Sequence, residues 1–171
     1  VATAKKALDE TMKFDRTLAE ISGIGDFDKI DAQFSLMRQK ALDMGVSSTV
    51  GANDAALALK NLTANGLAAT DAIYSLGTTL KIASAGEMAI GDAANIATEQ
   101  MNSFKLSVKD LDMIGGVMAK AANLSSASVK DFALAGQYAG GVFQSIGWNI
   151  QDMGTSIAML KNVGLDASII G

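Results

Sequence analysis

The side chains that could act as nucleophiles in this chain are serines, because the sequence contains no cysteine and no histidine. Ser125 and Ser126 lie close to Lys130 in the sequence, and a lysine is able to activate a serine in some hydrolases. No oxyanion-hole motif accompanies them, and serines in this arrangement are typical of a helix start. We therefore interpret these residues as structural and expect no enzyme activity.

Paired carboxylates are the other candidates for catalysis or metal binding. Asp26 with Asp28, and Asp110 with Asp112, lie too close in sequence to face each other across a glycosidic bond. At helix starts they interact favourably with the positive end of the helix dipole. The usual zinc, haem and thiolate sites are excluded without histidine and cysteine. Gly23-Ile24-Gly25 lacks the third glycine of a dinucleotide-binding loop, so we expect a linker there, and no cofactor or metal.

The composition favours helices and excludes several classes of partner. Proline is absent and aromatic residues make up 5% of the 171 residues. With a formal net charge of −4, the chain has no basic surface that would neutralise phosphates, so we expect no specific nucleic-acid binding. Because the chain opens with Val1, we interpret it as an excerpt of a longer protein.

Hydrophobic residues recur at helical spacing along the chain, in segments separated by short polar turns. This pattern predicts an all-α fold, a compact array of about seven or eight helices with turns capped by Gly, Ser, Asn or Asp and no sheet. Helices should end where a hydrophobic residue follows a glycine, because glycine adopts the left-handed cap conformation and the next residue folds back. The predicted stop residues are Gly66, Leu67, Gly86, Gly147, Trp148, Gly164 and Leu165.

The chain is predicted to have two parts. Residues 1–45 should form two amphipathic helices that make an extended hairpin or an oligomer contact, with Leu8 and Met12 on the apolar face of the first. The second of these helices is expected over residues 28–44. Residues 46–171 should form a core helical domain.

Two near-identical segments predict the starts of two further helices. Ser107 and Ser128 are each followed three positions later by an aspartate, Asp110 and Asp131, which is an aspartate version of the capping box. Asn149 is expected to cap a later helix in the same way.

Several glycines lie inside the predicted helices, where each costs up to about 1 kcal/mol relative to alanine. A compensating role is therefore expected, and close packing between helices is the simplest, within one subunit or between copies. The candidates for such packing are Gly115, Gly116, Gly136, Gly140 and Gly141. A break of the helix at Gly140-Gly141 is the alternative for that pair.

The stretch from Phe132 to Gln151 carries no charge and in length could cross a bilayer. Tyr138 and Val142 belong to its hydrophobic pattern, but Gln137 and Gln144 are expensive in hydrocarbon. A buried or inter-helix surface is therefore favoured over a membrane span, and membrane contact stays open as an alternative.

Alanine- and leucine-rich segments follow one another in a fixed order from Ala41 onward. Residues 55–67 (AALALKNLTANGL) and 80–86 (LKIASAG) are the most distinctive. Further segments are residues 92–97, 101–106, 117–123, 129–132 and 158–165. In this order they resemble the core region of tail tape-measure proteins of long-tailed bacteriophages and prophages. The sequence departs from that family at residues 138–141, where members often carry a proline.

The resemblance implies a structural virion protein without catalytic residues. Such a tape measure sets tail length, templates assembly of the tail tube from the tail tip, and is released with DNA during ejection. The implied partners are further copies of itself, in a homo-oligomer such as a trimer, together with tail-tube and tail-tip or baseplate proteins. The protein would be made in the bacterial cytoplasm and reside in the virion, in the tail lumen or at the tail tip.

Two other classes of function compete with this interpretation. A membrane-active helical protein would act at the host envelope during DNA entry, through the uncharged stretch from Phe132 to Gln151. A helical cell-wall hydrolase would need a pair of acidic residues across its substrate, and the sequence offers none at suitable spacing.

Overall fold

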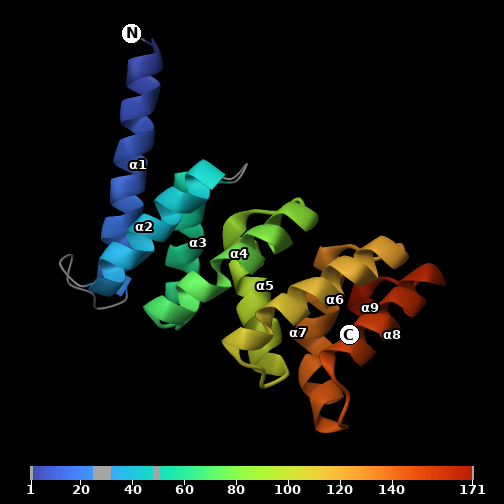
Figure 1. Cartoon of the computed structure of the whole chain (residues 1–171). Coiled ribbons are helices and arrows are strands. Elements are labelled where there is room, and N and C mark those ends of the chain that lie inside the picture. The colour runs from blue at the N-terminus through green and yellow to red at the C-terminus, as the bar shows by residue number, and fades with distance from the viewer. Residues whose placement is uncertain (1, 25–31, 48–50, 171) are drawn as a thin grey trace. The chain divides into compact units, whose positions relative to one another are not determined.

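The computed structural model describes residues 2–24, 32–47 and 51–170, which form helices and no strand (Figure 1). The α-helices are α1 (Ala2–Ile24), α2 (Ala32–Ser47), α3 (Ala52–Ala64), α4 (Ala69–Ala85), α5 (Ile90–Ser103), α6 (Leu111–Leu124), α7 (Val129–Ser145), α8 (Ile150–Asn162) and α9 (Ala167–Ile170). A 3-10 turn, η1 (Val108–Asp110), leads into α6. The predicted all-α fold is confirmed, and the described residues contain nine α-helices.

The chain divides into two compact units, Val1–Leu80 and Lys81–Gly171, with the division inside α4. The sequence prediction placed a boundary after residue 45, between an N-terminal contact region and a core. That boundary concerns the roles of the two segments and stays a prediction. Asp26 and Asp28, and the expected start of the second helix, lie outside the described residues.

In the first unit, α1 and α2 both pack on α3. The apolar side chains recur at steps of three and four residues, which places them on one face of each helix. The buried residues are Phe14, Leu18 and Ile21 of α1, Phe34, Met37 and Ala41 of α2, and Ala55, Leu59 and Leu62 of α3. The core of this unit is therefore the junction of three helix faces.

Two details of the first unit differ from the sequence prediction. Leu8 and Met12 are exposed, because the first turns of α1 extend away from α2 and α3 (Figure 1) and the buried stripe begins at Phe14. The second helix does not end at Gly45 but continues to Ser47. A Cβ at Gly45 would lie 2.6 Å from the Ala52 nitrogen, so this glycine lets the start of α3 approach α2 closely.

The second unit is built from two rows of helices. In one row α7 packs on α5 and α9, and in the other α8 packs on α6; neighbouring helices of the chain then contact each other across the rows. The starts of α5 and α7, Ile90 and Val129, are 39 residues apart, and so are the starts of α6 and α8, Leu111 and Ile150. A helix pair thus recurs along the unit, although the sequences of the segments are unlike.

The core of the second unit lies between its two rows. Phe132, Ile114, Met118 and Met153 are all completely buried there. Met37 of the first unit is buried, and so are Met101, Met118 and Met153 of the second. Since methionine fills irregular gaps, it suits helices that meet at glycines and alanines.

Candidate functional site

Three of the predicted helix stops have the backbone geometry of a Schellman motif. Gly66, Gly147 and Gly164 have φ angles of +92°, +83° and +87°. At the first of them, the Gly66 N–H donates to the Thr63 carbonyl at 2.9 Å and the Leu67 N–H donates to the Leu62 carbonyl at 3.1 Å. The same two hydrogen bonds recur at Gly147 and Gly164. At each stop, the N–H groups of the glycine and of the next residue therefore bond to carbonyls that have no partner within the helix.

The hydrophobic residues after these glycines differ in their surroundings. Leu67 is buried, whereas Trp148 and Leu165 are partly exposed. The Trp148 ring stacks on Phe143, with ring centroids 5.0 Å apart, so it anchors the turn after α7.

At the fourth predicted stop, Gly86, helix α4 does end, at Ala85, but the cap geometry differs. The left-handed residue there is Glu87, with a φ of +45°, and Gly86 precedes it. A Cβ at Gly86 would overlap the Met88 side chain and lie 3.3 Å from the Val129 Cβ. Gly86 is therefore needed for close approach to the start of α7, and not for a positive φ. Lys105 also adopts a positive φ, of +53°, at the end of α5.

The glycines inside helices fall into two groups. Gly136 of α7 lies against Gln100 of α5, and a Cβ at Gly140 would lie 3.0 Å from the Ser103 Cβ. By contrast, nothing lies within 4 Å of a Cβ built at Gly116 or Gly141. Gly115 is half-buried in α6. Helix α7 runs through Gly140-Gly141 without the break that was the alternative.

A further glycine, Gly154 of α8, occupies the tightest crossing between α6 and α8. A Cβ there would lie 2.6 Å from Cγ1 of Val117 and 3.1 Å from Cε2 of Phe132. The two rows therefore share a feature. In one row Gly136 of α7 meets Gln100 of α5, and in the other Gly154 of α8 meets Val117 of α6.

The predicted capping boxes are present. The backbone N–H and the hydroxyl of Ser107 both donate to Asp110 Oδ2, at 2.9 and 2.7 Å. Ser128 makes the same bonds to Asp131, and the Asn149 N–H donates to Asp152 Oδ2 at 2.9 Å. The hydrogen bonds from Ser107 lower the pKa of Asp110.

Asp131 also joins α7 to α8. Lys161 Nζ lies 3.2 Å from its Oδ1, and both side chains are largely buried. Burial raises the pKa of Asp131, but the hydrogen bonds from Ser128 and the Lys161 ammonium outweigh it, so the net shift is downward.

Ser125 and Ser126, which were considered as nucleophiles, form hydrogen bonds near the contact between α7 and α8. The Ser125 hydroxyl donates to the Ala121 carbonyl at 2.7 Å, which ends α6. The Ser126 hydroxyl donates to the Lys161 carbonyl at 2.9 Å, and its N–H donates to Asn162 Oδ1 at 2.9 Å. Ser126 therefore holds the loop between α6 and α7 against the end of α8, while Ser125 bonds within α6 and the loop itself.

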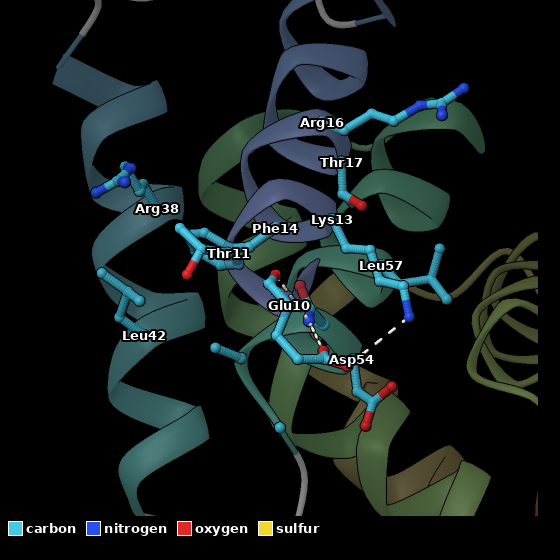
Figure 2. Close-up of a pocket in the computed structure, with 13 residues that line it drawn as sticks. Glu10, Thr11, Lys13, Phe14, Arg16, Thr17, Arg38, Leu42, Asp54 and Leu57 are labelled. Carbon is cyan, nitrogen blue, oxygen red and sulfur yellow. Dashed lines mark hydrogen bonds and ion pairs between the residues drawn. The ribbon is translucent and has the colours of Figure 1, made fainter. Parts of the chain in front are cut away.

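The first unit contains a hollow of about 800 Å³ between α1, α2 and the start of α3 (Figure 2). Apolar and charged side chains mix in its walls, and Phe14, Leu42 and Leu57 supply the apolar part. The Arg38 guanidinium lies 5.5 Å from the centre of the Phe14 ring. The Asn53 amide donates to the Glu10 backbone carbonyl at 3.2 Å and also contacts the Glu10 carboxylate.

The cations around this hollow are paired with carboxylates. The pairs are Lys13–Glu10 at 3.7 Å, Arg16–Glu20 at 3.4 Å and Arg38–Asp15 at 3.3 Å. These pairs lie near the surface, and such charges contribute little to stability. Because cationic and anionic groups balance, the hollow does not select a ligand of one charge.

Two kinds of site are absent from the described ranges, a metal-ligand cluster and a membrane-spanning helix. Within them, no three Asp, Glu, His or Cys side chains converge as a set of metal ligands. Among the helices that the structure describes, none combines the length and apolar character that a bilayer crossing requires.

Comparison with known proteins places the chain in a family. A protein family described as phage-related minor tail protein matches residues 38–171, which is most of the chain. The chain belongs to this family. As a phage-related minor tail protein, it is a structural component of the phage tail, and the resemblance found in the sequence is confirmed at this level.

The chain is also similar to a tape measure protein. It is 23% identical to the "Tape measure protein" of Pneumococcus phage Dp-1 over 135 residues. The similarity covers 79% of this chain and 12% of the phage Dp-1 protein. No solved structure matches the chain.

Sequence reasoning missed an exposed feature of this minor tail protein. Tyr138 and Val142 follow the helical hydrophobic pattern and were expected to face other helices, but both are exposed, as is Ile146. Positions 135, 136, 139 and 140 form the buried face of α7 instead. The small size of those residues is the signal that was available, because alanine and glycine mark a close helix crossing.

Proposed function

We propose that this chain is a segment of a tail tape measure, which sets tail length and templates assembly of the tail tube from the tail tip. The observation that carries the proposal is the similarity to the tape measure protein of phage Dp-1, which extends over 79% of the chain. The helical construction supports it, since α-helices convert residue number into length at about 1.5 Å per residue.

The proposed partners are further copies of the chain, tail-tube subunits and tail-tip or baseplate proteins. Gly116 and Gly141 support such contacts, because nothing lies within 4 Å of a Cβ built at either and another backbone could approach there. The formal net charge of −4 supports release together with DNA during ejection, because an acidic protein is not held by phosphates.

The experiment that tests this function is a duplication of residues 129–166 in the full-length protein of the virion. This segment is one helix pair, from the start of α7 to the residue before α9. If the added helices lie end to end, the tail should lengthen by about 57 Å, which is 1.5 Å for each added residue. If the pair stacks beside its neighbours, the increase should be about 8–10 Å, the distance between packed helices.

Tail length in electron micrographs of purified virions is the measurement. Deletion of the same residues should shorten the tail by the same amount. A matched control exchanges the exposed Asn95 for alanine and leaves the chain length unchanged, so its tails should keep the parental length. Tails of unchanged length after both duplication and deletion would refute a measuring role for this segment.

A further inference from the structure

Helix α5 buries less apolar surface than the three helices that follow it. Each of α6, α7 and α8 buries at least one large apolar side chain completely, such as Ile114, Phe132 and Met153. The large side chain that α5 buries completely is a polar one, Gln100, and the apolar residues on its buried face are alanines apart from Met101. Because the hydrophobic effect scales with the apolar area removed from water, α5 gains less from packing than its neighbours do.

The amide of Gln100 opposes the contact between α5 and α7. Its oxygen and its nitrogen both lack a hydrogen-bond partner within the described part of the chain, and the side chain is completely buried. It lies against Gly136 of α7, where a Cβ would overlap the amide. A buried amide without a partner has lost its hydration, and it regains that hydration when the helix moves away. The side chain at this contact therefore favours separation of the two helices.

The turns at both ends of α5 contain strained residues. The left-handed positions after α3, α7 and α8 are glycines, whereas those on either side of α5 are Glu87 and Lys105, with φ angles of +45° and +53°. A residue with a side chain is disfavoured in this conformation. Both turns therefore store strain that relaxes when the segment between them opens.

The start of α5 lacks one residue of a capping box. Ser107 and Ser128 each pair with an aspartate three positions later, and α5 has an aspartate, Asp92, at the equivalent position. The N-cap residue of α5 is Ala89, which makes no side-chain hydrogen bond to the helix. The first turn of α5 is therefore without the cap that α7 and α8 have.

We propose that the α5 segment, defined as residues 87–105, is an opening element that detaches from α7 and unfolds while the rest of the second unit stays folded. Its small apolar area, its buried amide, its strained turns and its missing cap are separate features, and each of them favours the open form of the same segment. Segments with few buried apolar contacts are the ones that open locally in proteins. The inference goes beyond the proposed function and does not rest on it.

The other helices of the second unit hold together without α5. Helix α8 packs on α6 and α7, and α9 packs on α7 and α8. The start of α6 has its own capping box, in which the Ser107 hydroxyl donates to Asp110 Oδ2 at 2.7 Å. Opening of the α5 segment therefore leaves α6 intact and uncovers the face of α7 that carries Gly136.

Hydrogen exchange of the full chain, followed by mass spectrometry, tests the opening element. After correction for intrinsic rates, the amides of residues 90–103 should exchange faster than those of residues 129–145 by about tenfold or more. Low concentrations of urea should accelerate exchange in α7 much more than in α5, because a local opening exposes little surface.

Two substitutions should close the α5 segment by different routes. Ala89→Ser completes the capping box with Asp92 and should slow exchange of the α5 amides about fivefold. Gln100→Met removes the buried amide and should slow exchange of the same amides by about 5- to 30-fold. Because Ala89 is exposed, its variant keeps the test decisive even where a change in the core prevents folding.

Gly116→Ala is the matched control, because it should stabilise α6 and its Cβ meets no other side chain. It should slow exchange of the α7 amides, which requires unfolding of the whole unit, and leave the α5 amides unchanged. Equal slowing of α5 and α7 in this variant would show that α5 opens only with the whole unit, and would overturn the proposal. So would α5 amides that exchange no faster than those of α7, or that respond to neither Ala89→Ser nor Gln100→Met.

Tail length distinguishes this proposal from the proposed function. Rapid local exchange of α5 in a protein whose virions ignore the duplication of residues 129–166 would refute only the measuring role. Slow exchange of α5 in a protein whose duplication lengthens the tail would overturn only the opening element.

Discussion

Gly154→Ala is the substitution that most directly tests how α6 and α8 are held together. The new Cβ would lie 2.6 Å from Cγ1 of Val117 and 3.1 Å from Cε2 of Phe132. Ordinary carbon contacts lie at about 3.5–4.0 Å, so one neighbour must move by about 1 Å. Phe132 is completely buried, and valine has one strongly preferred rotamer in a helix, so neither moves easily.

Two opposing effects set the magnitude for Gly154→Ala. Alanine inside a helix is more favourable than glycine by about 1 kcal/mol. Overpacking of a core typically costs about 1–3 kcal/mol, and the stiffness of both neighbours places this site in the upper half of that range. We therefore expect the free energy of unfolding to fall by about 1–2 kcal/mol, which is about 4–16 °C in melting temperature for a unit of this size.

Urea unfolding followed by circular dichroism is the assay, with Gly116→Ala as the matched control. Gly116 precedes Val117 on α6 and has open space around it, so the same substitution should stabilise by about 0.5–1 kcal/mol. Val117→Ala in the Gly154→Ala background should recover part of the loss, with a coupling of about 0.5–3 kcal/mol. If Gly154→Ala stabilises the protein as much as Gly116→Ala does, the close approach of α6 and α8 is wrong.

The remaining predictions concern caps, charge and buried polar groups. Burial raises the pKa of Asp131, but its hydrogen bonds and the Lys161 ammonium hold it below the ordinary 3.8. The ionised carboxylate therefore stabilises the fold above pH 3.8, and this stability is lost as the pH falls through the lowered pKa. Asp131→Asn should weaken the loss of stability in acid, as measured by urea unfolding at a series of pH values. Gly66→Ala should destabilise the protein by about 1–2 kcal/mol in thermal unfolding, because Gly66 has a φ of +92°. Glu87→Gly should be neutral or stabilising, because Glu87 has a positive φ of +45°. Losses of equal size in the two variants would contradict this reasoning. Within the described part of the chain, neither amide atom of Gln100 has a hydrogen-bond partner. Gln100→Met should therefore raise the unfolding free energy by about 1–2 kcal/mol, and a loss instead would show that the amide is satisfied.

The parts of the fold that local physics determines could be predicted from the sequence. Helix ends at Gly66 and Gly164 follow from the need for a left-handed residue, and they are found where the glycine-leucine pairs occur. The starts at Ser107 and Ser128 follow from the hydrogen bonds of a capping box, which involve residues three positions apart. Such interactions need no knowledge of the rest of the molecule.

The parts that depend on distant neighbours could not be predicted. At the stop after α4 the left-handed residue is Glu87, and a Cβ at Gly86 would lie 3.3 Å from the Cβ of Val129, more than forty residues away. Met12 has the helical spacing of a core residue, yet its side chain is exposed. The pairing of α5 with α7 likewise depends on small residues that meet across the row, and their sequence spacing reveals no partner.

The absence of charge between Asp131 and Asp152 has two separate explanations in the structure. On one side of α7, Phe132, Ala135 and Ala139 are buried against neighbouring helices, and a charge there would lose its hydration. On the other side, Tyr138, Val142 and Ile146 are exposed, and nothing within the described part of the chain prevents charged residues at those positions. Packing within one copy therefore accounts for only half of the uncharged stretch.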